Sequence, residues 1–174
     1  MDEEQLNESA AMTAEETEED EASEMAFLTG DAVVFGEDED GRLHVLAIRR
    51  RWDPFAGFWA LPGGHLNPGE DEEAGCRREL EEETGLRVGE LVRTGVYGAP
   101  GRDPRGRYVT LAYAARIEDG LPVPIPRSDA AEAAWLPVDR VVGGYLPVAY
   151  DHRVIVRDAV PIGRRGGAAG VLAR

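Results

Sequence analysis

The chain has 174 residues, of which 43% are hydrophobic, and these values suit one soluble domain with a sizeable core. Its 34 acidic residues outnumber its 19 basic residues, and the net charge of −15 argues against binding to a polyanionic nucleic acid. The sequence shows no apolar run long enough to cross a bilayer, no secretory signal and no cysteine besides Cys76, so we expect a cytoplasmic protein with no membrane partner and no internal disulfide.

The two ends of the chain differ from its middle in composition. Residues 1–25 contain eleven acidic residues and no arginine. Because such a segment cannot bury enough apolar surface to offset the entropy lost on ordering, we expect a disordered acidic tail there, with a lure for a basic partner as the functional alternative. Residues 163–174 are rich in glycine and are expected to form a flexible C-terminal tail. A single folded domain is therefore expected over residues 26–162.

Apolar patterning and turn signals predict the elements of this domain in chain order. Five strands and one short extended segment (the third range) are expected at residues 27–35, 43–51, 58–61, 89–96, 108–117 and 133–136. Two helices are expected, a charged one over residues 71–84 and a closing one over residues 151–160, the latter capped by Asp151. This order predicts the α/β class, with a mixed sheet between helices.

The charged helix carries an unusual concentration of carboxylates. At about 100° per residue, Glu79, Glu82 and Glu83 share one narrow face, and Glu81 points the opposite way. Like charges one turn apart repel, and the helix macrodipole disfavours anions near the C-terminus. A hard divalent cation such as Mg²⁺, which prefers oxygen ligands, would relieve this repulsion. The alternative is an acidic helix that is simply solvated.

The residues around these glutamates match a longer pattern. Gly64, five residues, Glu70, seven residues and then RELEEETGL, from Arg78 to Leu86, resemble the Nudix box, G-x5-E-x7-R-E-U-x-E-E-x-G-U, where U is aliphatic. Every defined position is filled, and the resemblance extends from about Phe27 to Val160. It implies a Nudix hydrolase domain over residues 26–162 with a Nudix-type α/β/α sandwich.

The resemblance also implies roles for individual residues. It assigns Mg²⁺ or Mn²⁺ to a set of oxygen ligands: the side chains of Glu79, Glu82 and Glu83 and the carbonyl oxygen of Gly63. It makes Glu70 and Arg78 a structural ion pair between the loop and the helix. The family hydrolyses a nucleoside diphosphate linked to another moiety by means of a metal-activated water.

The base that accepts the proton of this water is less sharply defined by the resemblance. Members of the family use either a glutamate of the box or an acid on a loop far downstream. Glu79 is the first choice in this chain. Glu132 is the second, as base or additional metal ligand, followed by Asp129 in the same loop; an exposed acid without a role is the alternative for Glu132.

Positive charge for a pyrophosphate must come from arginine, because the chain has no lysine. Arg51 ends a predicted strand just before the box. The Gly/Pro-rich loop YGAPGRDPRGRY, from Tyr97 to Tyr108, adds three more: Arg102, Arg105 and Arg107. We expect these four arginines to contact the substrate.

The substrate class follows from a weaker resemblance. Pro100, about fifteen residues beyond the box, and the RDPRG stretch resemble features of ADP-ribose pyrophosphatases within the family. The expected reaction therefore converts ADP-ribose to AMP and ribose 5-phosphate. A broader sugar-nucleotide pyrophosphatase, a nucleoside triphosphate-sanitising hydrolase and a non-catalytic nucleotide-sensing module remain open, as does a homodimer.

Overall fold

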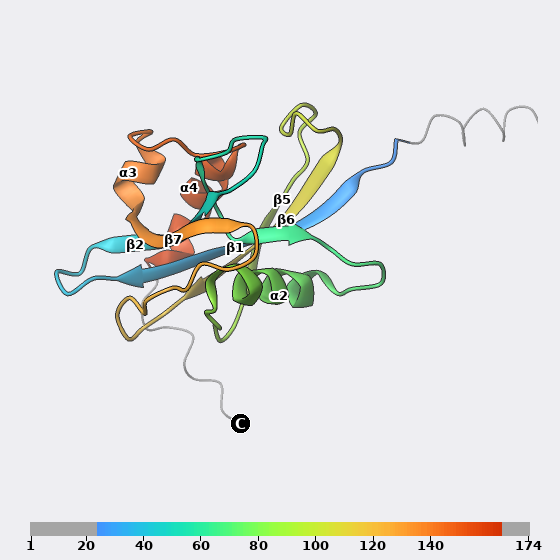
Figure 1. Cartoon of the computed structure of the whole chain (residues 1–174). Helices are drawn as coiled ribbons and strands as arrows, with labels where there is room; N and C mark the ends of the chain where they lie inside the picture. Colours follow the sequence, from blue (N-terminus) through green and yellow to red (C-terminus); the bar gives the residue numbers. More distant parts are fainter. Residues whose placement is uncertain (1–23, 165–174) are drawn as a thin grey trace, which may run out of the picture.

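The computed structural model describes residues 24–164, whose arrangement is drawn in Figure 1. Within that range the chain forms seven strands: β1 (Phe27–Glu37), β2 (Leu43–Arg50), β3 (Trp59–Ala60), β4 (Gly63–His65), β5 (Val92–Tyr97), β6 (Tyr108–Arg116) and β7 (Ala130–Pro137). The same range holds three helices: α2 (Glu72–Thr84), α3 (Val138–Val142) and α4 (His152–Gly163). None of these helices is long and apolar enough to cross a bilayer. The two expected tails lie almost entirely outside the described residues.

The strands form one mixed sheet. β3, β2, β1, β6 and β5 lie side by side in that order, while β4 pairs with β1 and β7 pairs with β2. β1 and β6 run parallel, and the other strand pairs run antiparallel. Helix α2 covers one face of the sheet, and α3 and α4 cover the other (Figure 1). The expected α/β sandwich with a mixed sheet between helices is confirmed.

Strand β1 lies in the middle of the sheet and is buried on both faces. All of its residues from Thr29 to Gly36 are buried, as expected for a strand that helices cover on both sides. Val33 and Phe35 pack in the cluster that contains residues of α4. Ala32 and Val34 pack in the cluster that contains residues of α2, because successive side chains on a strand point to opposite faces. A polar side chain on this strand is therefore placed inside the molecule.

Helix α2 begins and ends at local sequence signals. The Asp71 carboxylate accepts hydrogen bonds from the backbone N–H groups of Glu73 and Ala74, which satisfies two donors of the first turn. Gly85 follows the helix in the left-handed conformation (φ 69°), and its N–H donates to the carbonyl of Glu81. The box residues are therefore fixed on a helix whose two ends are both capped.

Several predicted boundaries differ from the observed ones. β5 begins at Val92 rather than at residue 89, and β7 spans Ala130–Pro137 rather than residues 133–136. β7 is longer because it pairs with β2 along its whole length, a long-range contact that local patterning does not reveal. The short helix α3 was not predicted.

The expectation that Asp151 caps α4 with its side chain is wrong. Asp151 precedes the helix, but its carboxylate makes no capping hydrogen bond. It instead accepts from the guanidinium of Arg102, with Nε 2.9 Å from Oδ2. An ion pair with a residue far away in sequence therefore competes successfully with the local cap.

Cys76 is predicted to be chemically inert in the folded protein. It is fully buried beneath β1, where a Cβ atom on Gly30 would lie only 3.3 Å from its own Cβ. Burial raises the pKa of the Cys76 thiol to about 12, so the reactive thiolate is scarce at neutral pH. A thiol-specific chromogenic reagent should therefore react only after denaturant is added. Rapid labelling of the native chain would contradict this packing.

Candidate active site

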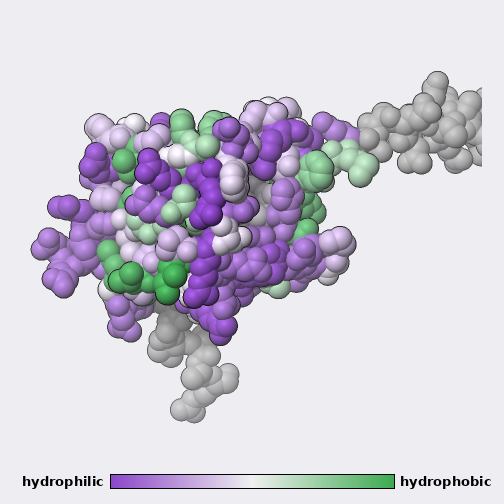
Figure 2. Space-filling view, viewed as in Figure 1, coloured by the Kyte–Doolittle hydropathy of each residue, from purple (hydrophilic) through white to green (hydrophobic). Residues whose placement is uncertain are grey.

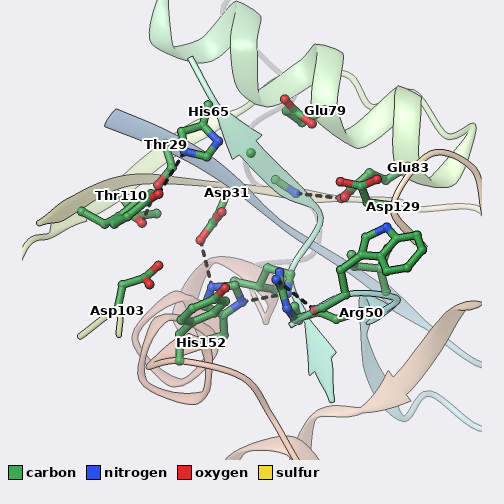
Figure 3. Close-up of a pocket in the computed structure, with 18 of the residues that line it drawn as sticks. Thr29, Asp31, Arg50, His65, Glu79, Glu83, Asp103, Thr110, Asp129 and His152 are labelled. Carbon is green, nitrogen blue, oxygen red and sulfur yellow. Dashed lines mark hydrogen bonds and ion pairs between the residues drawn. The ribbon is translucent and has the colours of Figure 1, made fainter. Parts of the chain in front are cut away.

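A cavity of about 400 Å³ lies where strand β4 meets the C-terminal half of helix α2. Its walls come from β1, the end of β2 and the segment after it, β4, α2, the loop between β5 and β6, the start of β6, the loop before β7 and the start of α4 (Figure 3). The charged side chains that line it are Asp31, Arg50, Arg51, Asp53, Glu79, Glu83, Arg102, Asp103, Arg105 and Asp129. Figure 2 shows hydrophilic side chains where α2 lies in Figure 1. The cavity therefore brings carboxylates and guanidinium groups together in one space.

Two of the three predicted glutamates of α2 face this cavity. Glu79 and Glu83, one turn apart, both line it, whereas Glu82 does not and has a side chain that is 51% exposed. The Glu83 carboxylate accepts a hydrogen bond from the N–H of Gly63 (3.0 Å). A Cβ atom on Gly64 would lie 2.5 Å from the carboxylate carbon of Glu79, so a larger residue here would displace the Glu79 carboxylate from its present position.

Arg78 ties the β4 loop to α2. Its guanidinium donates two hydrogen bonds to Glu70, from Nε (2.8 Å) and Nη2 (2.9 Å), and one to the carbonyl of His65 (3.0 Å). The hydrogen bonds from Arg78 lower the pKa of Glu70 to about 2, so this carboxylate stays ionised. Nη1 of Arg78 also donates to Glu79 (2.7 Å) and lies 3.4 Å from Glu82. Arg78 thus holds the loop through Glu70 and, at the same time, two of the three glutamates predicted as metal ligands.

Carboxylates crowd together at the inner wall of the cavity. Burial raises the pKa of Glu83 to about 8, and the neighbouring charges of Glu79 and Asp31 add to the effect of burial, against the hydrogen bond from Gly63. Burial likewise raises the pKa of Asp31 to about 7, although Arg102 opposes it. Without a further cation, Glu83 and Asp31 are therefore partly protonated at neutral pH, and this wall does not carry its full negative charge.

The oxygen donors at this wall fit a hard divalent cation in chemical type. Glu79, Glu83 and Gly63 line the same wall, and carboxylate and carbonyl oxygens are the ligands such ions prefer. Among residues 24–164, however, no three His, Cys, Asp or Glu side chains are grouped closely enough to hold a metal ion. Arg78 pairs with Glu79 and Glu82 instead. The donors are therefore present, while Arg78 supplies part of their counter-charge.

The predicted substrate arginines separate into two groups. Arg51, Arg102 and Arg105 line the cavity, whereas Arg107 lies outside it and donates to the carbonyl of Gly98. Arg102 is the most deeply buried of them, with a side chain only 6% exposed.

The charges of the three cavity arginines are not equally available. Arg102 is paired with Asp151, and Arg105 donates to Asp103 (2.7 Å). Burial tends to raise the pKa of Asp103, but the hydrogen bonds from Arg105 outweigh it and lower that pKa. Arg51 makes a hydrogen bond to the carbonyl of Ala130 (3.1 Å) and has no ion-pair partner among the described residues.

Of the two acids downstream of the box that were proposed as base, one lies at the cavity and the other does not. Glu132 lies on β7, 3.5 Å from Arg49, and is not part of the cavity wall. Asp129 lies on the cavity wall, and Figure 3 shows it beside Glu83, whose pKa it helps to raise. The geometry therefore favours Asp129 over Glu132 for any role at the site.

Several residues of the cavity were not assigned to it from the sequence, among them Asp31, Arg50, Tyr150 and His152. The signal for Asp31 was present, because an acid interrupts the apolar run of a predicted strand. The side chain of Arg50 turns towards the loop before β3 and donates to the carbonyl of Pro54 (2.8 Å). Tyr150 and His152 reach the cavity only through the path of the chain into α4, which has no local sequence signal.

The raised pKa values predict how stability depends on pH when metal is removed. Glu83 and Asp31 have normal values of 4.5 and 3.8 but are raised to about 8 and about 7 in the fold. The unfolded chain therefore binds fewer protons, so the free energy of unfolding should fall by about 1 kcal/mol between pH 7 and pH 8. Burial lowers the pKa of His152 to about 3, and that residue titrates below this window in both states.

Urea unfolding in EDTA at several pH values measures this slope. Glu83→Gln should remove most of it, because glutamine does not titrate. A free energy of unfolding that rises from pH 7 to pH 8, or a slope that Glu83→Gln does not change, would contradict the placement of Glu83 in a desolvated wall.

Comparison with known proteins adds independent evidence. The chain is 36% identical over 115 residues to the ADP-ribose pyrophosphatase of Methanocaldococcus jannaschii, a match that covers 66% of this chain and 64% of that protein. It is 32% identical over 136 residues to the ADPR responsive transcriptional repressor NtrR of Acinetobacter baylyi, covering 76% of this chain and 52% of the repressor. The chain thus matches less than two thirds of the length of each relative.

A solved structure shares the fold. The NUDIX domain of Shewanella oneidensis NrtR, complexed with ADP ribose, matches with a TM-score of 0.72 and 30% identity, covering 82% of this chain and 91% of that domain. The family description "NUDIX domain" matches residues 28–159, which include nearly all of β1, all of helix α2 and the first two thirds of α4. The filled box, the sandwich around it and this match over most of the chain lead to one conclusion: the protein belongs to the NUDIX family.

Proposed function

We propose that this chain is a Nudix hydrolase that cleaves the diphosphate of a nucleoside diphosphate linked to another moiety. ADP-ribose, giving AMP and ribose 5-phosphate, is the first substrate to test. The observation that carries the proposal is the cavity itself, in which Glu79 and Glu83 face the same space as Arg51 and Arg105. A diphosphate needs both cationic contacts and a way to activate water, and this space offers residues for each.

Each residue on the α2 side of the cavity has a proposed role. Glu79, Glu83 and the carbonyl oxygen of Gly63 would hold Mg²⁺ or Mn²⁺, and Glu82 would join them on release from Arg78. When bound, the cation supplies charge neutralisation at the phosphates and a more acidic water. Glu79 is the proposed proton acceptor, and Asp129 on the facing loop is the second choice. Arg78 keeps Glu79 in place through its own pair with Glu70.

The arginines of the cavity bind and orient the diphosphate. Arg51 is exposed, lines the cavity and has no ion-pair partner among the described residues, so its charge is available to a phosphate oxygen. Arg105 approaches the cavity from the loop between β5 and β6 and is held by Asp103. Arg102 contributes chiefly by holding the start of α4 through Asp151.

A substrate panel tests the proposal. ADP-ribose, other sugar nucleotides, dinucleoside polyphosphates and oxidised nucleoside triphosphates are incubated with the protein and Mg²⁺, and products are separated by ion-exchange chromatography. AMP and ribose 5-phosphate in equal amounts from ADP-ribose, lost on addition of EDTA, are the expected result. Preferential cleavage of triphosphates would instead make the chain a sanitising hydrolase.

A nucleotide sensor without turnover is the second candidate. It is supported by the relatives, one of which is named an ADPR responsive transcriptional repressor. For the same reason, the expectation that this chain has no nucleic-acid partner stays a prediction. Tight binding of ADP-ribose with no cleavage of any panel member would favour the sensor.

A further inference from the structure

Two buried polar atoms of the described chain lack a hydrogen-bond partner. They are Oδ2 of Asp31 and the hydroxyl oxygen of Tyr150. Both residues line the active-site cavity. Buried polar atoms in native proteins are almost always paired, because leaving one unpaired costs a large part of its hydration energy. The concentration of both atoms in one cavity therefore indicates that a bound molecule completes their hydrogen bonds.

Asp31 is held in position by its neighbour His152. The side chain of Asp31 is only 7% exposed, and Nε2 of His152 lies 3.3 Å from Oδ2 without the alignment of a hydrogen bond (Figure 3). Nδ1 of His152 accepts the N–H of Leu61 (2.9 Å), so the neutral ring carries its proton on Nε2, towards Asp31. This arrangement orients the carboxylate, and Oδ2 still lacks an aligned hydrogen-bond donor.

Tyr150 is held in a strained conformation. Its φ of 50° lies in the left-handed region, which is unfavourable for a bulky side chain. The other non-glycine residues with positive φ among residues 24–164 are Phe55, whose ring centroid is 4.8 Å from that of Tyr150, and Ser128, which lines the same cavity. Backbone strain of this kind concentrates at functional positions. The fold therefore maintains an unfavourable backbone in order to present the Tyr150 ring and hydroxyl to the cavity.

The charges around Tyr150 indicate what lies beside the hydroxyl group. The guanidinium carbons of Arg50 and Arg105 lie 5.1 Å and 5.5 Å from the centroid of its ring. They provide positive charge for phosphate, whereas the carboxylate of Asp31 repels phosphate and accepts a hydrogen bond from a neutral donor. A sugar hydroxyl next to a phosphate satisfies both requirements.

We propose that Asp31 and Tyr150 form a hydroxyl-binding subsite that recognises a sugar of the nucleoside diphosphate substrate. The inference rests on the proposed function and adds specificity to it. A hydroxyl group donates to Oδ2 of Asp31 and accepts from the hydroxyl of Tyr150, while His152 positions Asp31. The sugar is either the ribose of the nucleoside or the sugar beyond the diphosphate, and the two share this chemistry.

Two conservative substitutions test the subsite. Tyr150→Phe removes one oxygen atom, and Asp31→Asn keeps the shape of the side chain. Affinity is measured by titration calorimetry with Mg²⁺ and the non-hydrolysable α,β-methylene analogues of ADP-ribose and of ADP. Each substitution should weaken binding of the ADP-ribose analogue by about tenfold, the loss of one hydrogen bond to a buried partner. An unchanged affinity for ADP assigns the subsite to the distal sugar, and an equal loss with ADP assigns it to the nucleoside ribose.

A stability measurement separates this role from a structural one. Because the hydroxyl of Tyr150 has no partner in the protein, Tyr150→Phe should leave the melting temperature of the free chain unchanged or higher. The matched control is Tyr97→Phe, since the hydroxyl of Tyr97 donates to Asp158 (3.3 Å) outside the cavity. This control should lower the melting temperature slightly and leave both affinities unchanged.

The outcomes distinguish the failure of the subsite from the failure of the proposed function. If the unsubstituted protein binds both analogues and neither substitution changes either affinity, the subsite is overturned and the proposed function stands. If the unsubstituted protein binds neither analogue, both are overturned.

Discussion

Replacing Glu83 by glutamine is expected to lower kcat by about 10³-fold, since losing one carboxylate at the metal removes several kcal/mol of transition-state stabilisation. In EDTA the same change should raise the free energy of unfolding at pH 7. With a pKa of about 8, Glu83 must take up a proton on folding at that pH, a cost that glutamine does not carry. The side-chain oxygen of glutamine also still accepts the N–H of Gly63, which lies 3.0 Å from the present carboxylate.

Glu81→Gln is the matched control for this result. Glu81 lies on the same helix but is paired with Arg87 (2.6 Å) and is absent from the cavity wall. Its substitution should change kcat by less than about twofold, as for a surface position remote from the chemistry. Steady-state rates with Mg²⁺ and urea unfolding of both variants provide the comparison. Equal rates for Glu83→Gln and Glu81→Gln in folded protein would remove Glu83 from the mechanism.

Replacing Arg102 by methionine is expected to destabilise the protein by about 3 kcal/mol, at the lower end of the range for breaking a buried pair because Asp151 keeps some exposure. The Arg102 side chain is 6% exposed and donates to Asp151 and to the hydroxyl of Thr110 (2.6 Å). Its loss leaves the Asp151 carboxylate beside Asp31 without a counter-charge. Urea unfolding at pH 7 measures the effect.

A second substitution should reverse most of that loss. In Arg102→Met combined with Asp151→Leu, no unpaired charge remains, and buried ion pairs are often replaced by apolar residues at little cost. The double-mutant cycle therefore predicts a strong favourable coupling between the two changes. Additive effects, or a single-variant loss below about 1 kcal/mol, would show that the pair does not hold the start of α4.

The parts of the fold with local causes could be predicted from the sequence. Helix α2 begins after Asp71 and ends before Gly85, because the capping aspartate and the left-handed glycine each act on residues within one turn of the chain. Strand β1 was recognisable from the apolar residues at its start and from Ala32 to Phe35, although Asp31 interrupts the run.

The predictions that were wrong concern residues whose positions depend on contacts distant in sequence. Asp151 has the local signature of a helix cap, yet its partner is Arg102, 49 residues earlier. Arg107 belongs to the same arginine-rich loop as Arg102 and Arg105, but it turns away from the cavity. Local spacing does not report which way a loop side chain turns.

The candidate site shows the same division. The glutamates that face the cavity, Glu79 and Glu83, share a helix face that the sequence predicts by periodicity alone. Asp31 and Tyr150 come from a central strand and from the turn into α4. Their meeting depends on the path of the whole chain, so only the structure reveals them as a pair.

Anomalous diffraction from crystals grown with Mn²⁺ tests the central claim, that negative charge on α2 is there to hold a cation. We expect an anomalous peak at about 2.0–2.2 Å from carboxylate oxygens of Glu79 and Glu83, with the carbonyl oxygen of Gly63 nearby and Arg78 displaced from Glu82. Crystals that show no such peak, both with and without a bound nucleotide, would contradict the account.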